Sequence, residues 1–526
     1  MAAQERIVMT TKQIRRIALW IFALCFCFAA AQAGAPETAD SGRKEITSLD
    51  DLAGAEIGVQ TGMICDVLTQ QRIADTRIQY YNSQTDAMIA LESGKVAGWC
   101  CDEPVVRYMS LTHPDLVILD EALAESNLAA VFPKTDRGQA LRDQFSAFVD
   151  GLWADGTMEQ IDAVWFSTDE EKRTVPDYTA LPDTNGTLVM ATDPTIPPFS
   201  FVKDGRAAGY DIDVAFRFCQ ANGYRLEIIQ MSFDSILAAV QTGKCDFAVS
   251  SITVTAERAE NVLFSTPDYR GGVVMAVLKG GAAVSPEPVS FWDGIAAGFE
   301  KTFIREDRWL LFAKGVLTSL TITLLSVLCG TLLGFGVYML CRNGNPAANG
   351  VTRFCMWLVQ GMPVVVLLMI LYYVVFGNIS GTAVAVIGFT LTFGAAVVGL
   401  LRMGVGTVDP GQYEASVALG FSGRTTFYRI ILPQALPHIL PAYKREIVSL
   451  IKATAVVGYI AVQDLTKVGD IVRSRTYEAF FPLIAVTVIY FLMEGLMAFL
   501  VSKIQVRLNP RRRKPESILK GVKPHD

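Results

Sequence analysis

The chain has 526 residues, enough for several domains, and 51% of them are hydrophobic. Its formal net charge of -6 argues against nucleic acid as a partner, because phosphate binding requires a basic surface. The ten cysteines form no disulfide framework in their spacing, and three histidines argue against a histidine-based metal or catalytic site. Cys219 and Cys245 are a candidate bridge, although buried free thiols are the more common outcome.

The first 33 residues have the layout of a secretory signal peptide or an N-terminal anchor. Lys12, Arg15 and Arg16 precede an apolar run from Ile17 to Ala31, which ends in the small-residue sequence AQAG. The run is short for a full membrane span, which favours a cleaved signal over an uncleaved anchor. Either form would export the residues that follow.

Residues 45–280 alternate short strand-like runs with helix-length segments, which indicates α/β lobes with mainly parallel sheets. The runs include 56–60, 78–81, 188–192 and 226–230. Ligands of such sheets bind beyond the carboxyl ends of the strands, so the residues just after these runs are candidates for a binding site.

Four motifs in this region resemble the solute-binding proteins of polar amino acid importers. GTLVMATDPTIPPFSFVKDGRAAGYDIDVA (186–215) and VSSITVTAERAENVLFSTPDY (249–269) are similar to parts of their first lobe. ITSLDDLAGAEIGVQTG (46–62) and GKVAGWCCDEPVV (94–106) are similar to parts of their second lobe. The resemblance implies an α/β bilobal domain of the type II periplasmic-binding-protein class.

The order of the two lobes is inverted in this chain. Second-lobe segments come first, closing helices follow around 150–166, and first-lobe segments occupy 186–280. A circular permutation would produce this order, with the old termini joined near 167–186 and new termini at the hinge. Two degenerate half-domains from a decayed tandem pair are the alternative, but neither lobe type is duplicated.

The resemblance also implies a cleft for a zwitterionic amino acid, with a cation for its carboxylate and an anion for its ammonium group. Arg258 matches the family's carboxylate-binding arginine, and Asp102 matches the aspartate that binds the ammonium group from the opposite lobe. Further candidates for ligand binding are Ser250, Ser251 and Thr253 beside Arg258, and Asp193, Ile196, Phe199 and Phe233 around the ligand side chain.

These residues are weak signals when taken singly. An arginine after a Ser/Thr-rich turn is usually a surface or cap residue, and Phe199 and Phe233 alone would more often belong to the core. The chain also departs from the family pattern: Met63 and Ile64 replace the usual small hydroxyl residues, and Ile196 stands where an aromatic residue is common. The pocket is therefore expected to be more apolar than usual, and the sequence does not fix its substrate.

Residues 281–310 are predicted to form a linker with an amphipathic stretch at the membrane surface, or a soluble linker helix. Its aromatic residues are Trp292, Phe299, Phe303 and Trp309. Residues 311–510 are predicted to form an all-α transmembrane domain of about five spans. The apolar runs lie at about 313–341, 354–376, 382–401, 446–462 and 482–504, and Lys452 lies inside the fourth.

Basic residues predict the orientation of these spans. Arg342 and Arg353 flank the first connection, Arg402, Arg424, Arg429, Lys444 and Arg445 crowd the third, and residues 511–526 form a basic tail. These parts are expected in the cytoplasm, which places the binding domain outside the cytoplasmic (inner) membrane. Lys467, Arg473 and Arg475 fall on the outer side, so the positive-inside rule is obeyed only in tendency.

The third connection, GQYEASVALGFSGRTTFYRIILPQALPHILP (411–441), resembles the cytoplasmic coupling segment of binding-protein-dependent importer permeases, in their polar amino acid branch. The resemblance implies a short helix that docks on an ATPase. A surface helix with a glycine at its C-terminal cap is the alternative for any one residue. The candidate coupling residues are Glu414, Ala415, Gly420, Leu432 and Pro433.

The sequence has no G-x-x-x-x-G-K-[ST] phosphate loop, so we expect no cofactor on this chain and ATP and Mg on a separate ABC ATPase subunit. A permease homodimer is the economical assembly, and a pair with another permease is the alternative. The expected function is that of an ABC permease, a transport subunit and not an enzyme, with a fused receptor that imports an amino acid or close analogue.

Two other functions use the same bilobal fold. A ligand-gated channel or amino acid sensor would carry the lobes beside membrane spans, but in such channels the pore interrupts the lobes, whereas here both precede the spans. An enzyme would need an acid/base pair or a Ser-His-Asp arrangement, and neither is evident. His113 is expected in a loop before Pro114.

Overall fold

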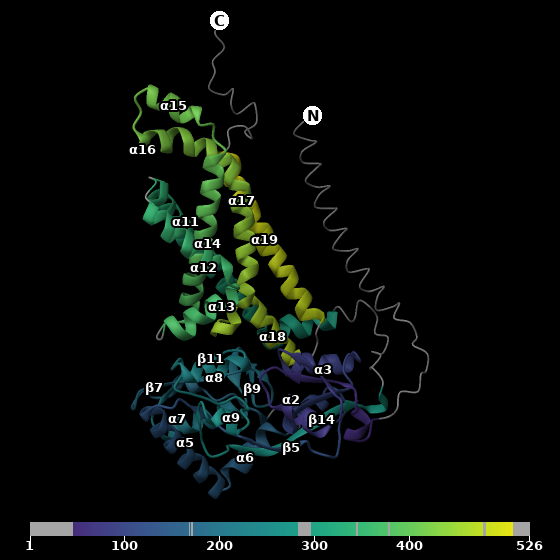
Figure 1. The fold of residues 1–526 in the computed structure, drawn as a ribbon. Coiled ribbons are helices and arrows are strands. Elements are labelled where there is room, and N and C mark those ends of the chain that lie inside the picture. Colours follow the sequence, from purple (N-terminus) through teal and green to yellow (C-terminus); the bar gives the residue numbers. More distant parts are fainter. Residues whose placement is uncertain are drawn as a thin grey trace. The chain divides into compact units, whose positions relative to one another are not determined.

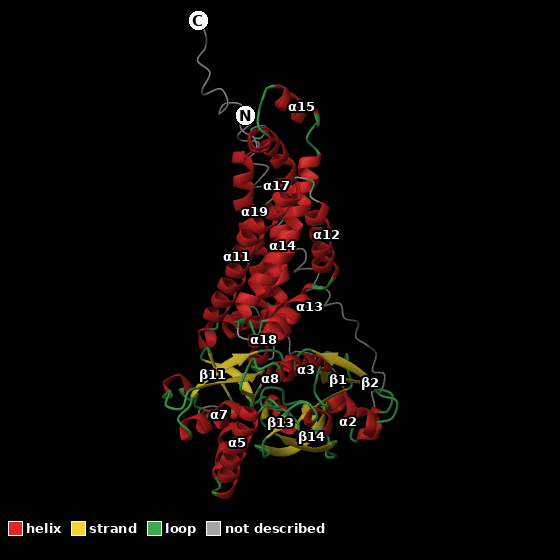
Figure 2. Cartoon of the chain, turned by 60° about the vertical axis from the view of Figure 1, so that its left-hand side comes forward, coloured by secondary structure: helices red, strands yellow, loops and turns green. Residues whose placement is uncertain are grey.

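The computed structural model describes residues 46–508 except 168, 170, 171, 282–295, 343, 345, 377, 378 and 477–479. The predicted signal (1–33), the basic tail (511–526) and Trp292 lie outside the described residues. The described residues of 46–279 and 296–508 belong to one compact unit. Within it, strands occur in the first part of the chain and long helices in the second (Figures 1 and 2).

The first sheet, which we call the β1 lobe with the helices that cover it, has the order β2-β1-β3-β14-β4. Its strands are β1 (Glu56–Gln60), β2 (Arg77–Tyr81), β3 (Gly98–Asp102), β4 (Leu116–Ile118) and β14 (Tyr269–Leu278), and β5 (Ala124–Leu128) pairs with β14. Its helices are α2 (Cys65–Arg72), α3 (Gln84–Glu92) and α4 (Glu103–Ser110). β1 is parallel to β2 and β3, and every residue of β3 is buried, as expected for a central strand covered on both faces.

The second sheet, the β7 lobe, has the order β11-β7-β12-β6-β13. Its strands are β6 (Val131–Phe132), β7 (Thr187–Thr192), β11 (Arg225–Gln230), β12 (Phe247–Ala248) and β13 (Leu263–Phe264). The lobe also carries a small antiparallel sheet of β8 (Thr195–Ile196), β9 (Ser200–Lys203) and β10 (Arg206–Ala208). Its helices are α5 (Asp136–Ala154), α6 (Thr157–Trp165), α7 (Tyr210–Ala221), α8 (Phe233–Gln241) and α9 (Ala256–Ala259).

Each sheet takes one strand from the other half of residues 46–279. β6 follows the β1-lobe strands in sequence but pairs with β12 and β13, while β14 follows the β7-lobe strands but pairs with β3 and β4. One interlocked pair of lobes, with the closing helices α5 and α6 packed on the β7 lobe, is the arrangement that a circular permutation gives. The opened ends lie beyond β14, inside the β1 lobe, so the prediction of new termini at the hinge itself was wrong.

The core of the β7 lobe is built from aromatic rings on α5, α7 and the sheet. The ring centroid of Phe145 lies 4.9 Å from that of Phe218 and 5.7 Å from that of Phe132, and the ring of Phe132 stacks on Phe247. Such ring pairs add to the free energy gained by burying the rings. Cys219 and Cys245 are buried free thiols, so the candidate disulfide is absent from this core.

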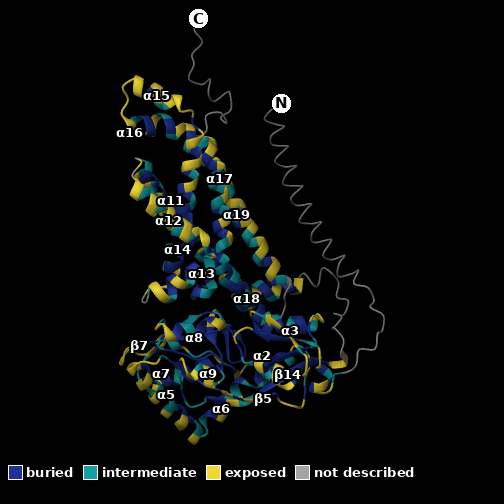
Figure 3. Cartoon of the chain, in the orientation of Figure 1, coloured by how far each residue is buried: buried dark blue, intermediate teal, exposed yellow. Residues whose placement is uncertain are grey.

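Among the described residues, three helices are long and apolar enough to cross a membrane, or up to five spans if each of two bent helix pairs counts as one. The three are α11 (Trp309–Arg342), α14 (Gly381–Gly406) and residues 481–503 of α19 (Phe480–Leu508). Leu317, Leu332 and Leu340 of α11 are exposed, as expected of a surface that faces lipid. Figure 3 shows exposed segments, in yellow, along the long helices of the second part of the chain. The predicted five spans are therefore reached only with both bent pairs included.

The bent pairs are the second and fourth predicted spans. The second consists of α12 (Pro346–Gly361) and residues 364–375, which form α13 (Val364–Met369) and η7 (Ile370–Val375), and it bends by 107° at Met362 and Pro363. Proline at this break is consistent with its missing N–H donor. The fourth joins residues 423–460, mainly α17 (Leu432–Ala453) and η9 (Thr454–Ile460), to α18 (Leu465–Thr476) at 59°.

Candidate ligand-binding site

Arg258 bridges the two lobes. It lies in α9, whose N-terminal Thr255 accepts a hydrogen bond from the Arg258 backbone N–H at 3.2 Å. The guanidinium donates from Nη1 to the carbonyl of Thr253 in its own lobe at 2.8 Å and from Nη2 to the carbonyl of Gly62 in the β1 lobe at 2.7 Å. It also lies over the ring of Phe233, 5.9 Å from its centroid.

Gly62 makes this approach possible. It follows β1 and has a φ of 86°, a conformation that residues with a side chain rarely adopt. A Cβ added there would lie 3.4 Å from the Asp234 backbone and 3.5 Å from the Phe233 ring. The turn of the β1 lobe therefore packs directly against the start of α8 in the β7 lobe.

Asp102 lies at the end of β3 and is 4% exposed. Its carboxylate accepts hydrogen bonds from Ser126 Oγ at 3.1 Å and from Ser251 Oγ at 3.0 Å, and Ser251 belongs to the other lobe. Burial raises the pKa of Asp102 to about 6, although both hydrogen bonds and the charge of Arg258 oppose the rise. A buried carboxylate and a guanidinium thus influence each other across the junction of the lobes.

The Ser/Thr-rich turn after β12 contributes mainly through its backbone. Ser251 has a φ of 50°, and its N–H donates to Asp211 Oδ2 at 3.0 Å. Ser250 Oγ accepts the Asp193 N–H at 2.9 Å, and Thr253 offers its carbonyl to Arg258. These contacts hold the turn in place, whereas the ligand bonds expected of the three hydroxyl groups stay a prediction.

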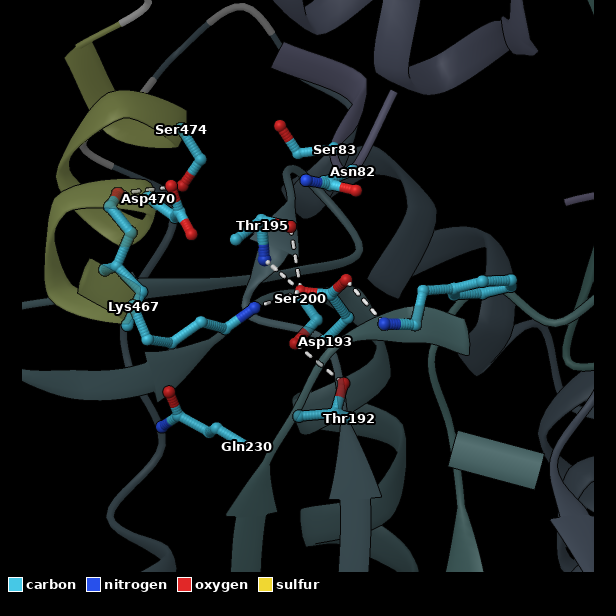
Figure 4. A network of polar contacts seen from close by, with 12 residues as sticks. Asn82, Ser83, Thr192, Asp193, Thr195, Ser200, Gln230, Lys467, Asp470 and Ser474 are labelled. Carbon is cyan, nitrogen blue, oxygen red and sulfur yellow. Dashed lines mark hydrogen bonds and ion pairs between the residues drawn. The ribbon is translucent and has the colours of Figure 1, made fainter. Parts of the chain in front are cut away.

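Asp193 has several hydrogen-bond partners within the protein. Its carboxylate accepts from the N–H and Oγ1 of Thr195, from the Phe233 N–H at 3.0 Å and from Gln60 Nε2 at 3.5 Å. Lys467 of α18 lies 3.6 Å away (Figure 4). Asp193 therefore links both lobes and a helix of the membrane part.

The apolar candidates for ligand binding divide into residues beside Arg258 or at the start of α2, and residues deeper in the β7 lobe. Phe233 is nearly buried beneath Arg258, and Met63 is buried with its sulfur 2.7 Å from Gln84 Nε2, while Ile64 begins α2 and is half-buried. Ile196 and Phe199 are fully buried.

Phe199 is packed among the rings of three other aromatic residues. Its ring contacts the rings of Phe166, Tyr210 and Tyr269 at centroid distances of 5.3 to 5.8 Å. These surroundings are those of a core residue, and the role of Phe199 in ligand binding stays a prediction.

Three residues of the junction were not found from the sequence: Ser126, Gln60 and Asp211. Ser126 reaches Asp102 only because β5 and β3 both pair with β14. Asp211, whose pKa burial raises to about 7, accepts the Ser251 N–H. The position of Gln60 at the carboxyl end of a strand-like run was the one sequence signal that could have indicated it.

The coupling candidates lie on an exposed helix and the turn that follows it. Glu414 and Ala415 are exposed on α15 (Gly411–Ala418), and Gly420 ends the helix with a φ of 80°. Leu432 is half-buried and Pro433 exposed at the start of α17, which Gln434 Nε2 ties to Gln412 of α15 at 3.1 Å. The glycine cap is present, as the alternative interpretation also expects.

Two lobes joined across a cation and a carboxylate, in one chain with a bundle of apolar helices, define a receptor fused to a membrane domain. The family model of bacterial extracellular solute-binding proteins, family 3, matches residues 188–455, about half of the chain. The chain belongs to this family. The match begins in β7, so the β1-lobe strands β1 to β5 precede it.

The chain is also related to transport permeases over nearly their whole length. It is 31% identical over 215 residues to a putative glutamine transport system permease protein, GlnP, of Rickettsia bellii, covering 40% of this chain and 98% of the relative. It is 29% identical over 200 residues to the arginine transport system permease protein ArtQ of Bacillus subtilis, covering 37% and 91%. A crystal structure of an amino acid ABC transporter with histidines is 30% identical, covers 42% of this chain and 99% of that chain, and has a TM-score of 0.36.

The similarity to the two permeases, together with the apolar helices, identifies the second part of the chain as a permease. The chain thus combines a solute-binding receptor and a permease in one polypeptide. It is a transport subunit and a multi-pass inner-membrane protein.

Proposed function

We propose that the chain imports an amino acid or a close analogue, which its receptor lobes bind and its helices translocate. The observation that carries this proposal is the pairing of Arg258 and Asp102 at the junction of two lobes. A zwitterionic ligand can bond to both groups at once, its carboxylate to the guanidinium and its ammonium group to the buried carboxylate. The names of the permease relatives, which transport glutamine and arginine, support an amino acid as the substrate class.

Groups of the ligand would replace protein groups as the hydrogen-bond partners of Arg258 and Asp102. Arg258 gives one donor to Gly62, and Asp102 accepts Ser251 from the opposite lobe. A ligand carboxylate can take the guanidinium fork, and a ligand ammonium group can take the Asp102 oxygens. Closure then depends on a ligand that presents both charges at the correct spacing.

ATP and Mg would be bound by a separate ATPase subunit, which would contact the exposed face of α15. Val417 and Leu419 are 70% and 74% exposed there. Apolar side chains exposed in water favour burial against a partner. The basic residues of the connections and of the tail sequence support a cytoplasmic position for α15 and the C-terminus, with the lobes outside.

A homodimer would supply two permease units around one path. Lys452 of α17 pairs with Glu494 of α19 at 3.2 Å, yet its side chain is 63% exposed. A charge on the surface of an apolar bundle is costly in lipid. A second copy of the chain, or a polar path between two copies, would cover it.

The test is ATP hydrolysis by the chain reconstituted with its ATPase subunit in lipid vesicles. At least one of the twenty amino acids should stimulate hydrolysis. Arg258→Ala should abolish the stimulation, whereas Arg270→Ala, an exposed arginine over the Trp153 ring, should retain it. Unchanged stimulation in Arg258→Ala would remove the carboxylate assignment.

A further inference from the structure

A polar cavity of about 230 Å³ lies between the receptor lobes and the membrane helices. A water molecule needs about 10–15 Å³ of such space, so the cavity has room for on the order of fifteen waters, or for a small amino acid. Both lobes contribute hydrogen-bonding side chains to it: Thr61, Asn82 and Ser83 from the β1 lobe, and Thr195, Ser232 and Asp234 from the β7 lobe.

The opposite wall of the cavity is the break in the fourth span. Ala455, Gly458 and Tyr459 come from η9, and Thr466, Lys467 and Asp470 come from the start of α18. Irregular backbone at the edge of a membrane bundle is tolerated where it is buried in protein or lines a polar space. The break therefore opens onto the receptor.

Lys467 supplies a buried cation to this wall. Its side chain is 9% exposed, and Nζ lies 3.6 Å from Asp193 Oδ1. This distance allows ionic attraction but exceeds a normal N–H···O hydrogen bond, so Asp193 does not fill the donors of the ammonium group. Figure 4 shows the Lys467 side chain reaching from α18 toward Asp193, with Asp470 and Asn82 nearby. A buried ammonium group of this kind favours an additional anionic partner.

Asp470 supplies an accessible anion on the same helix. Its side chain is 38% exposed and its ion pair with Arg473 is long, at 3.4 Å. Arg473 in turn forms an ion pair with Asp86 of the β1 lobe. Asp464 is already committed as the N-terminal cap of α18, where it accepts the N–H groups of Thr466 and Lys467. Lys467 and Asp470 are three residues apart, about one turn of α18, so both line the cavity from the same face of this helix.

We propose that this cavity is a second binding site for the transported amino acid, with Lys467 holding its carboxylate and Asp470 its ammonium group. The proposal rests on the proposed function. The ion pairs of α18 reach one carboxylate in each lobe, Asp193 and Asp86, so the site is complete only while both lobes lie against the helix. The amino acid would thus pass from the cleft to a site shared by receptor and permease before it enters the bundle.

The test is the number of amino acid molecules bound per chain, measured by equilibrium binding of each of the twenty radiolabelled amino acids to the full-length protein in lipid nanodiscs. The wild type should bind two molecules per chain of the transported amino acid. Arg258→Ala should remove one site and leave the other. Lys467→Gln and Asp470→Asn should each weaken the second site about tenfold or more, since each removes a charge-assisted bond.

Retention of the first site in Lys467→Gln and Asp470→Asn shows that these variants are folded. The matched control is Lys314→Gln, which removes an exposed lysine of α11 outside the cavity and should leave both sites intact. One molecule per chain in the wild type, lost in Arg258→Ala and unchanged in Lys467→Gln, would overturn the second site alone. No binding of any amino acid would overturn the proposed function as well.

Discussion

Opposing effects act on the charge of Asp102. Burial keeps the folded-state pKa at about 6, above the ordinary value of 3.8, while Ser126, Ser251 and Arg258 favour the ionised form. Because the folded state holds the proton more tightly than the unfolded state, this contribution to the free energy of unfolding is present at low pH and lost as pH rises from about 4 to 6. The proposed bond to a ligand ammonium group needs the ionised form, so the proposed function and the stability have opposite requirements at Asp102.

We therefore expect Asp102→Asn to stabilise the ligand-free protein at pH 7.5. A shift of about two pKa units corresponds to about 3 kcal/mol, which is the upper limit of the gain, and the difference should vanish near pH 4. Thermal unfolding of the full chain across this pH range measures it, with exposed Asp50→Asn as the control. A variant that loses stability at pH 7.5 would show that the hydrogen bonds of the carboxylate outweigh its burial.

The sequence indicated residues that act through an ordered motif and missed those that depend on strand pairing. Asp102 ends β3 and Arg258 lies in α9 after β12, each within a family-like segment, and both lie at the junction of the lobes. Ser126 could not be predicted, because its contact with Asp102 requires β14 to pair with both β3 and β5. Phe199 has the same sequence context as a pocket residue, and only the packing of Tyr210 and Tyr269 places it in a core.

Among the elements, the strands of the receptor follow the sequence pattern closely and the membrane helices follow it only in part. Predicted runs at 56–60 and 188–192 correspond to β1 and β7 within one residue, because short apolar runs between turn signals define strands well. Hydropathy measures how long an apolar run is but carries no direction. The 107° bend at Met362 and Pro363 was therefore not foreseen.

The turn after α15 determines how the coupling helix is presented. Gly420 has a φ of 80°, and a Cβ there would meet no neighbouring atom, so an alanine at this position acts through backbone strain alone. Gly420→Ala should cost about 1 kcal/mol in the turn. We expect amino acid binding to be unchanged and ligand-stimulated ATP hydrolysis to fall severalfold.

Gly423→Ala is the matched control for Gly420→Ala, because Gly423 lies three residues further on without a positive φ and also has open space around its Cα. Both variants are compared by binding and by ATP hydrolysis in vesicles. Equal hydrolysis in the two variants would mean that the left-handed turn has no part in coupling.

At the scale of the whole molecule, receptor and permease share one chain, so each permease has a receptor at high local concentration. We expect native mass spectrometry of the assembled transporter to show two copies of this chain together with the ATPase subunits. The exposed Lys452 and the twofold symmetry that most oligomers adopt both favour this composition. One copy of the chain beside a different permease would contradict the homodimer.

The most direct test of the proposed import is ATP-driven accumulation of amino acids. The chain and its ATPase subunit are reconstituted in vesicles with ATP on the side of α15, and each radiolabelled amino acid is supplied on the side of the lobes. At least one amino acid should accumulate above its external concentration, and Arg258→Ala should abolish its accumulation while Arg270→Ala retains it. Absence of accumulation for every amino acid, in vesicles that hydrolyse ATP and hold folded receptor, would contradict the proposed function.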